Sequence, residues 1–201
     1  MQYFQYGETE IAWLKKRDPK LGEAIDEIGK IDRPVMPDLF EALVNSIVGQ
    51  QISAKAHDTI WDRIQSRITS LTPEGIAETP IEELQKCGIS MRKAEYIKGI
   101  AASVLAGELD LDGLHELPDE EIYKRLCKIR GVGNWTAEMI MIFSMQRPDV
   151  LSWDDLAIIR GLRMLYRHRK ITPALFAKYK RRYSPYSSTA SLYLWAISGG
   201  K

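Results

Sequence analysis

Two stretches of the sequence decide how this chain folds: LCKIRGVGNWTAEM at positions 126–139 and SWDDL at positions 152–156. In the first stretch, Gly131 and Gly133 flank Val132 between two segments with the apolar spacing of helices. The backbone can therefore turn tightly and enter a helix near Asn134. The N–H groups of such a turn, at the start of a helix, form a site for an anion such as a phosphate.

The second stretch brings two carboxylates to the start of another helix. Asp154 and Asp155 follow a short polar connection, and we expect a helix over residues 154–168. This placement returns a carboxylate towards the hairpin turn. If Asp155 is the reacting acid, Asp154 is the candidate helix cap or a residue that supports the acid. A purely structural interpretation is also open, because Ser152 and Asp155 have the spacing of a capping box, in which the acid only stabilises the helix start.

Charge is strongly segregated along the chain. The formal net charge is only +1, but residues 156–201 hold ten Lys and Arg and no Asp or Glu. A basic segment directly after the candidate acid predicts contacts with phosphates, although a solvated helix face would explain the same charges. A chain of 201 residues with 45% hydrophobic content can bury a sizeable core, as one unit or as two lobes.

The cysteines and the apolar runs limit the cofactor and the compartment. Cys87 and Cys127 are the only cysteines, so we expect neither a disulfide framework nor an iron–sulfur cluster. Nothing in the sequence resembles a membrane span or a signal peptide, and we expect a cytoplasmic, nucleoid-associated protein without membrane partners.

The apolar spacing predicts an all-α fold of about ten helices, most of them short. Four pairs of a capping residue and a proline indicate helix starts: Asp18-Pro19, Thr72-Pro73, Thr79-Pro80 and Thr172-Pro173. The expected helices cover residues 8–30 as a pair, 38–51, 53–67, 72–88 as a short pair, 90–104, 118–129, 134–144, 154–168, 172–181 and 183–195.

These motifs resemble the helix-hairpin-helix DNA glycosylase superfamily. Its hairpin reads L-x-x-x-x-G-V/I-G and precedes an aspartate by about twenty residues, as residues 126–133 and Asp155 do here. The runs GQQIS at 49–53 and SMRKA at 90–94 and the closing segment from Tyr183 to Trp195 are similar to further family motifs. Within the superfamily, the hairpin and acid are most similar to 3-methyladenine DNA glycosylase II.

The resemblance implies a fold of two helical lobes with a cleft between them. Residues 1–201 would form a single unit of the helix-hairpin-helix DNA glycosylase (HhH-GPD) fold. Residues 38–125 would form the central lobe, and residues 1–37 would join residues 126–201 in a second lobe that carries the hairpin and Asp155.

The resemblance also implies an activity: extrusion of a damaged nucleotide from DNA and hydrolysis of its N-glycosidic bond, with Asp155 as the catalytic residue. A purine methylated on ring nitrogen already carries positive charge, so one carboxylate suffices for its release. Relatives that also cut the backbone place a lysine where this chain has Trp135, so we expect monofunctional base excision of alkylated purines such as 3-methyladenine. The base pocket is expected to contain Trp195, Trp135, Met139 and Gln50.

The partner implied by the resemblance is double-stranded DNA with damaged bases, bound by a monomer. Gln51 would act as the wedge that fills the space of the extruded nucleotide. The residues expected at DNA phosphates are Arg130, Gly131, Val132, Gly133, Arg92 and Lys93. No cofactor is expected to be required, although hairpin carbonyls are expected to be able to hold a structural Na⁺ or K⁺.

Three other functions stay open at this point. The chain could be a helix-hairpin-helix protein that binds DNA without catalysis, or a glycosylase for oxidised or mismatched bases. It could also be a helical scaffold with no nucleic-acid partner, which would not respond to salt as a DNA-binding protein does.

Overall fold

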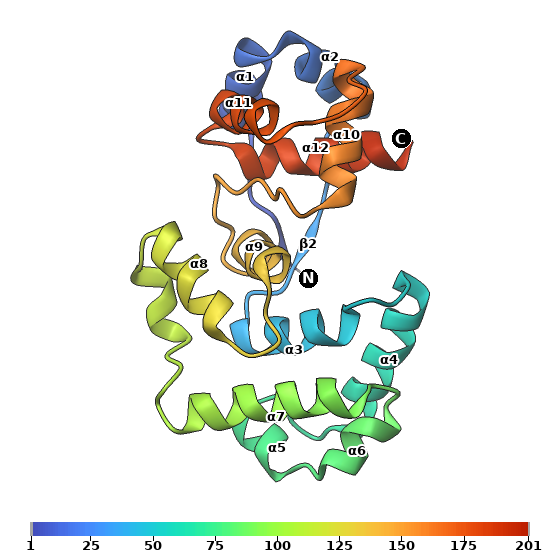
Figure 1. The fold of residues 1–201 in the computed structure, drawn as a ribbon, viewed down its shortest axis with the longest axis vertical. Coiled ribbons are helices and arrows are strands. Elements are labelled where there is room, and N and C mark those ends of the chain that lie inside the picture. Colours follow the sequence, from blue (N-terminus) through green and yellow to red (C-terminus); the bar gives the residue numbers. More distant parts are fainter. Residues whose placement is uncertain (1, 201) are drawn as a thin grey trace. The chain divides into compact units, whose positions relative to one another are not determined.

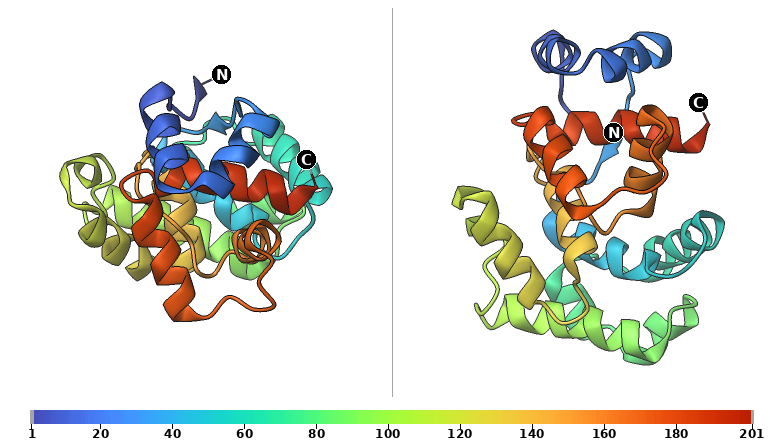
Figure 2. Two further views of the ribbon diagram at one scale, coloured as in Figure 1. Left: turned by 90° about the horizontal axis from the view of Figure 1, so that it is seen from above. Right: turned by 45° about the horizontal axis from the view of Figure 1, so that its top comes forward.

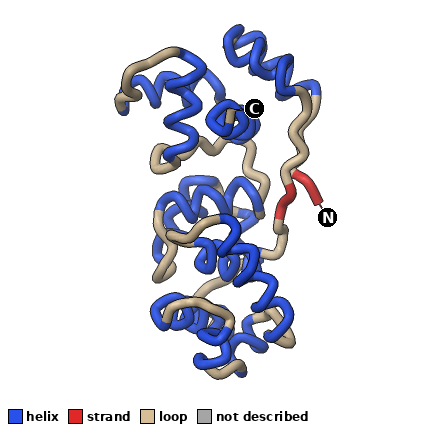
Figure 3. The backbone as a smooth tube through the Cα atoms, turned by 90° about the vertical axis from the view of Figure 1, so that its right-hand side faces the viewer, coloured by secondary structure: helices blue, strands red, loops and turns tan. Residues whose placement is uncertain are grey.

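The computed structural model of the chain describes residues 2–200, and these are mostly helical (Figures 1 and 3). No helix in that range is both long and apolar enough to cross a membrane. The elements, in chain order, are β1 (Gln2–Tyr3), α1 (Glu8–Arg17), α2 (Pro19–Ile28), β2 (Pro34–Val35), α3 (Leu39–Gly49), α4 (Ala54–Arg67), α5 (Pro73–Glu78), α6 (Ile81–Lys86), α7 (Met91–Leu105), the 3-10 helix η1 (Asp112–Glu116), α8 (Asp119–Lys128), α9 (Asn134–Phe143), α10 (Leu156–Tyr166), α11 (Pro173–Tyr183) and α12 (Ser187–Gly199).

The chain divides into two compact units. Unit 1 combines the chain up to Val35 with the chain from Met141 onward, and unit 2 is Met36–Ile140. We predicted a boundary at residues 125/126, which would have placed the hairpin with the two ends of the chain. The two compact units instead divide within α9, and the hairpin lies in unit 2, where side chains of residues 50 and 96 contact its turn.

In unit 1, helix α12 is the element on which the others pack. It contacts α10 most extensively and also contacts α2, α1 and α11 (Figure 2). Gly161 of α10 makes the closest approach possible, because a Cβ atom there would lie 2.3 Å from the backbone oxygen of Leu194 in α12. The two backbones therefore cross with no side chain between them at this point.

A buried polar cluster joins the α1–α2 turn to α10 and α11 in unit 1. Asp18, only 1% exposed, caps α2 by accepting the amide of Leu21. Its Oδ2 accepts the hydroxyl of Tyr166 at 2.6 Å and Nη1 of Arg182 at 2.7 Å. The hydroxyls of Tyr166 and Tyr183 lie 2.7 Å apart. The carboxylate is thus desolvated but paired with donors from two other helices.

Unit 1 also contains a two-stranded antiparallel sheet that we did not predict. β1 pairs with β2, with Gln2 opposite Val35 and Tyr3 opposite Pro34 (Figure 3). Each strand has two residues, which is too short for the alternation of apolar and polar side chains that reveals a strand in sequence.

In unit 2, helix α7 packs against α5, α6 and α3. Lys98 on α7 shows how it holds its neighbours: its Nζ donates to the backbone oxygens of Ile76, Ala77 and Thr79, at 2.9, 2.7 and 2.7 Å. The last carbonyls of a helix have no partner within the helix, and a cation suits their negative end. Lys98 therefore terminates α5 from outside.

Three of the four proline-marked helix starts are as predicted, with Asp18, Thr72 and Thr172 accepting an amide and proline at the first position. The fourth prediction is wrong. Thr79 does not cap α6; its hydroxyl donates back to the carbonyl of Gly75, and α6 begins at Ile81 after Pro80. Thr79 belongs to the end of the preceding helix because a hydroxyl can satisfy a carbonyl four residues back.

Candidate functional site

Asp155 is the residue at which α10 begins. Its Oδ1 accepts the amides of Ala157 at 2.8 Å and Ile158 at 2.9 Å, and its Oδ2 accepts Nε1 of Trp195 at 3.2 Å. The residue is 7% exposed. One carboxylate oxygen therefore serves the helix start, while the other is held by an indole from α12.

The division of roles between the two aspartates differs from the prediction. Asp154 was expected to cap the helix or to support the acid, but α10 starts at Leu156 with Asp155 as its cap, and Asp154 is exposed. The N-cap of α10 is Asp155, so the prediction of Ser152 as the capping residue is wrong. Asp155 nevertheless stabilises a helix start, as the structural interpretation expected, so the cap and the proposed reacting role belong to one carboxylate.

Trp195 lies at the centre of a small aromatic group beside Asp155. Its ring centroid is 5.4 Å from that of Phe143, at the end of α9, and the planes are tilted by 33°. The guanidinium of Arg33 lies 4.9 Å from the Phe143 ring centroid. Burial lowers the pKa of Arg33 below its ordinary value. A carboxylate, two aromatic rings and a cation thus meet within unit 1.

The distance between Asp155 and Trp195 is set by packing within unit 1. Gly161 lies six residues after Asp155 on α10, and the backbone it touches, Leu194, is adjacent to Trp195. Because both helices are close-packed there, the indole reaches the carboxylate without a strained loop.

The hairpin turn of unit 2 needs glycine at one of its two glycine positions for two reasons. Gly131 has φ +93°, which side chains rarely adopt, and a Cβ there would lie 2.4 Å from a ring carbon of Tyr96 on α7. Val132 is buried, and the amide of Val132 bonds the carbonyl of Ile129 at 3.0 Å. At Gly133 a Cβ would meet nothing within 4 Å, so the surface next to the start of α9 is open.

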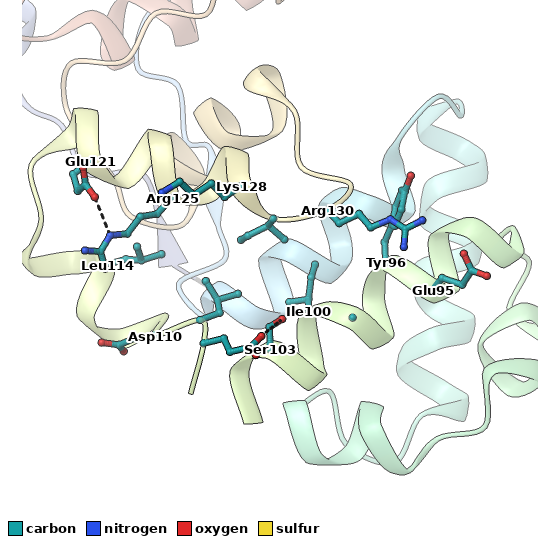
Figure 4. A pocket seen from close by; sticks show the side chains of 14 residues that line it. Glu95, Tyr96, Ile100, Ser103, Asp110, Leu114, Glu121, Arg125, Lys128 and Arg130 are labelled. Carbon is teal, nitrogen blue, oxygen red and sulfur yellow. Dashed lines mark hydrogen bonds and ion pairs between the residues drawn. The ribbon is translucent and has the colours of Figure 1, made fainter. Parts of the chain in front are cut away.

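Two predicted phosphate ligands, Arg92 and Arg130, flank Tyr96. Their guanidiniums lie 6.0 and 5.5 Å from its ring centroid, and Figure 4 shows Arg130 against the ring. Both arginines are exposed. Stacking on one tyrosine restricts their side chains beside the hairpin, which suits a pair of phosphate contacts.

A pocket of about 670 Å³ lies beside this pair, between α7, η1 and α8 (Figure 4). Its walls mix acidic and basic side chains, with Glu121 and Arg125 paired at 3.2 Å. None of the predicted base-pocket residues lines it, and Asp155 belongs to unit 1. We therefore do not assign it to the base.

The segment after α3, which was expected to carry the wedge, is held from two sides. The side-chain Nε2 of Gln50 donates to the carbonyl of Gly131, and Nζ of Lys93 donates to the backbone oxygens of Val48, near the end of α3, and Gln50. Gln51 is exposed with φ 55°. The side-chain nitrogen of Gln50 thus bonds the hairpin, and the ammonium of Lys93 bonds backbone carbonyls of the protein. A base contact of Gln50 stays a prediction, whereas phosphate binding by Lys93 is not supported by this geometry.

The other two predicted base-pocket residues lie on α9 in unit 2. Trp135 is 42% exposed, and Met139 is 8% exposed. Trp135 thus presents part of its indole to solvent, whereas Met139 packs into the core. Their contact with a base stays a prediction.

The hairpin carbonyls were expected to be able to hold a monovalent cation. Two of these carbonyls already accept hydrogen bonds. The carbonyl of Ile129 accepts the backbone N–H of Val132, and the carbonyl of Gly131 accepts the side-chain Nε2 of Gln50. Within residues 2–200, no group of three or more His, Cys, Asp and Glu side chains could hold a metal either. We assign no residue to an ion.

Residues 44–184 match the family model described as "HhH-GPD superfamily base excision DNA repair protein". The chain belongs to this superfamily. A relative from Schizosaccharomyces pombe, DNA-3-methyladenine glycosylase 1, is 35% identical over 164 residues, which cover 79% of this chain and 72% of that protein.

Solved structures of superfamily members share the fold. A DNA-3-methyladenine glycosidase from Bacillus halodurans has a TM-score of 0.87 at 35% identity, covering 99% of this chain and 93% of the other. The 3-methyladenine DNA glycosylase of Schizosaccharomyces pombe, solved with abasic DNA, has a TM-score of 0.84 at 31% identity, covering 95% and 97%. The predicted superfamily and the helical fold class are confirmed.

Sequence reasoning missed three residues of the site: Phe143, Arg33 and Tyr96. Phe143 ends an apolar helix and could have been noticed as the aromatic residue nearest in sequence to the acid on that helix. No local pattern marks Arg33 or Tyr96, because each acts on a segment far away in sequence.

Proposed function

We propose that this protein is a monofunctional DNA glycosylase of base excision repair. It hydrolyses the N-glycosidic bond of alkylated, cationic purines such as 3-methyladenine and leaves an abasic site. The observation that carries the proposal is the hydrogen bond between Trp195 Nε1 and Asp155 Oδ2 in a chain of this superfamily.

A single carboxylate is enough for this reaction. Ordinary glycosidic cleavage uses one acid to protonate the leaving group and a second carboxylate at the sugar. A methylated purine with a positive charge takes the bonding electrons as it departs and becomes neutral, so it needs no proton. Positive charge then develops on the deoxyribose, where Asp155 stabilises it, and water supplies the new C–O bond and loses a proton.

The hydrogen bonds of Asp155 prepare it for this role. Two backbone amides hold Oδ1, so the carboxylate cannot rotate freely, and the Trp195 indole fixes Oδ2. All of these groups complement negative charge and none has to reorganise when the sugar becomes positive.

The aromatic group next to Asp155 favours a cationic base. A cation over an indole face, removed from water, gains on the order of 2 kcal/mol. Trp195 is half-buried and supplies such a face. Arg33 already occupies one side of Phe143, so we assign recognition of the base to Trp195 rather than to Phe143.

The target nucleotide has to leave the duplex, at a cost of a few kcal/mol. Gln51 fills the space it leaves, and the amides at Gly131 and Gly133, together with Arg92 and Arg130, bind phosphates near it. The basic segment after residue 155 adds attraction for the backbone. The protein acts as a monomer on double-stranded DNA in the cytoplasm, without an obligatory cofactor.

Strand cleavage is not part of the proposed activity. Trp135 occupies the position where lyase-competent relatives carry a lysine, and an indole cannot form a Schiff base. Borohydride added during turnover should therefore trap no covalent protein–DNA complex. A trapped complex would show that another amine reacts and would overturn the monofunctional assignment.

The deciding experiment measures release of methylated purines from alkylated duplex DNA, and alkali-labile sites in the same duplex. Asp155→Asn keeps an acceptor for the helix start but loses the charge, and we expect the rate to fall by about a hundredfold or more. Asp154→Asn is the matched control, because it removes the same charge from an exposed neighbour, and it should excise normally. Equal rates for the two variants would remove Asp155 as the catalyst.

A panel of duplexes with oxidised and mismatched bases separates the remaining alternatives. Excision of those bases but not of methylated purines would reassign the substrate. Salt-sensitive DNA binding with no excision of any base would identify a non-catalytic DNA-binding protein.

A further inference from the structure

The segment that joins α3 to α4 has a conformation that its own sequence does not stabilise. Gln51 has φ 55°, the left-handed region that residues other than glycine rarely adopt. It comes two residues after the end of α3, where helix carbonyls lose their partners within the helix. Something outside the segment has to hold it.

Lys93 of α7 supplies that support. Its Nζ donates to the backbone oxygens of Val48 at 2.9 Å and Gln50 at 2.7 Å. The second contact fixes the peptide that leads into Gln51, which is the residue with positive φ. An ammonium also suits the negative end of α3.

Gln50 connects the same segment to the hairpin. Its side-chain Nε2 donates to the carbonyl of Gly131 at 2.8 Å, across 81 residues of sequence. Tyr96, three residues after Lys93 on α7, lies against Gly131. One face of α7 therefore touches both the segment before α4 and the hairpin turn, and it sets their spacing within unit 2.

A phosphate contact explains Lys93 less well than this role. Two of its three donors point at backbone oxygens, whereas the adjacent Arg92 is exposed and stacks on Tyr96. Burial lowers the pKa of Lys93 from its usual 10.5, in keeping with an ammonium that is partly withdrawn from water.

We propose that Lys93 is a positioning residue for extrusion of the damaged nucleotide: it holds Gln51 in its left-handed conformation and at a fixed distance from the hairpin. The inference rests on the proposed function. Loss of the ammonium then impairs entry of Gln51 into the duplex, while cleavage of an already extruded nucleotide proceeds as before.

The test compares one lesion in two settings. In one duplex the methylated purine is paired normally, and in the other it lies opposite an abasic site, where extrusion costs little. Lys93→Met keeps the stem and removes the ammonium. We expect single-turnover excision from the paired duplex to fall by about tenfold or more, and excision opposite the abasic site to change by less than about threefold.

Arg92→Met is the matched control, since it removes the same charge from the neighbouring position. It should weaken binding of both duplexes equally and lower the salt dependence by about one phosphate contact, whereas Lys93→Met should leave the salt dependence unchanged. If Lys93→Met fails to fold, Lys93→Gln, which also removes the ammonium, should give the same contrast between the two duplexes.

The outcomes separate the two ideas. If the unaltered protein excises from both duplexes and Lys93→Met loses activity equally on both, or matches Arg92→Met in its salt dependence, the positioning role is overturned and the proposed function stands. If the unaltered protein excises from neither, the proposed function fails and the positioning role fails with it.

Discussion

Nε1 of Trp195 donates a hydrogen bond to Oδ2 of Asp155 at 3.2 Å, so the acid assigned to the sugar and the indole assigned to the base are a bonded pair. The other carboxylate oxygen serves the first turn of α10. The pair joins the start of α10 to α12, and the two helices cross closely at Gly161. Each part of this arrangement can be tested.

Trp195→Phe keeps an aromatic face and removes the indole donor. A hydrogen bond to a charged group contributes about 1.5–3 kcal/mol, so we expect excision to slow by about ten- to a hundredfold in single-turnover assays. Trp13→Phe is the control, because Trp13 Nε1 donates to the carbonyl of Ser184 instead. Equal loss in both variants would indicate a general effect on unit 1.

Asp155 should also matter for stability. Asp155→Ala removes the acceptor for the amides of Ala157 and Ile158, and the free energy of unfolding should fall by about 1–2 kcal/mol. Asp155→Asn should lower the free energy of unfolding by less, since Asn is a good helix cap. Urea unfolding of the variants measures this, and equal stability of both would contradict the cap.

The crossing of α10 and α12 should tolerate no added atom at Gly161. Gly161→Ala places a methyl group 2.3 Å from the oxygen of Leu194, and we expect about 1–3 kcal/mol of destabilisation together with loss of excision. Gly99→Ala is the matched control: Gly99 is also helical, has nothing within 4 Å, and should stabilise α7 by about 0.5–1 kcal/mol. Thermal unfolding distinguishes the two.

Arg182→Met should destabilise the fold more than most substitutions of partly exposed residues. The variant leaves Asp18 buried without its cation. Removing one partner of a buried ion pair lowers the free energy of unfolding by about 3–5 kcal/mol, and the decrease should be smaller here because Arg182 is partly exposed. Arg181→Met removes the same charge from an exposed neighbour and should change stability by less than about 0.5 kcal/mol. Denaturant titration of both variants tests the contrast.

Alkaline pH should weaken the fold through its buried tyrosines. Burial raises the pKa of Tyr166, Tyr183 and Tyr193 well above the ordinary 10.0. Above pH 10 the unfolded chain loses these protons while the folded chain keeps them, so stability is complete below that pH and falls as pH rises. Each tyrosine lowers the free energy of unfolding by up to about 1.4 kcal/mol for each pH unit above 10.

Tyr166→Phe removes one of these groups. Although it loses its bond to Asp18 at neutral pH, its free energy of unfolding should fall less between pH 9 and pH 11 than that of the unaltered protein. An equal fall in both proteins would show that Tyr166 ionises in the folded state.

Helix positions were predictable because apolar spacing and capping residues are local signals. Asp18, Thr72 and Thr172 each begin a helix, as the adjacent prolines indicated. The error at Thr79 has a local cause too, since a threonine between two short helices can serve either one. The cap of α10 was displaced by one residue for the same kind of reason.

Long-range partners could not be predicted in this way. No spacing in the sequence indicates that Gln50 bonds Gly131, a contact that lies within unit 2 together with the hairpin. Lys93 illustrates the difficulty: its position near a helix start suggested a phosphate, but its partners are carbonyls more than forty residues earlier. The pairing of Asp155 with Trp195 was within reach only through family resemblance.

The position of Asp155 at the start of α10 also bears on how this chain could change over generations. A lineage that abandoned base excision would still be selected to keep an aspartate or a similar residue there, because the helix needs it. The indole at position 195 donates to the carboxylate oxygen that does not accept those amides, so the helix depends on it less and it would be replaced sooner once the reaction was lost. Trp195 is therefore a better marker of retained activity among descendants than the acid itself.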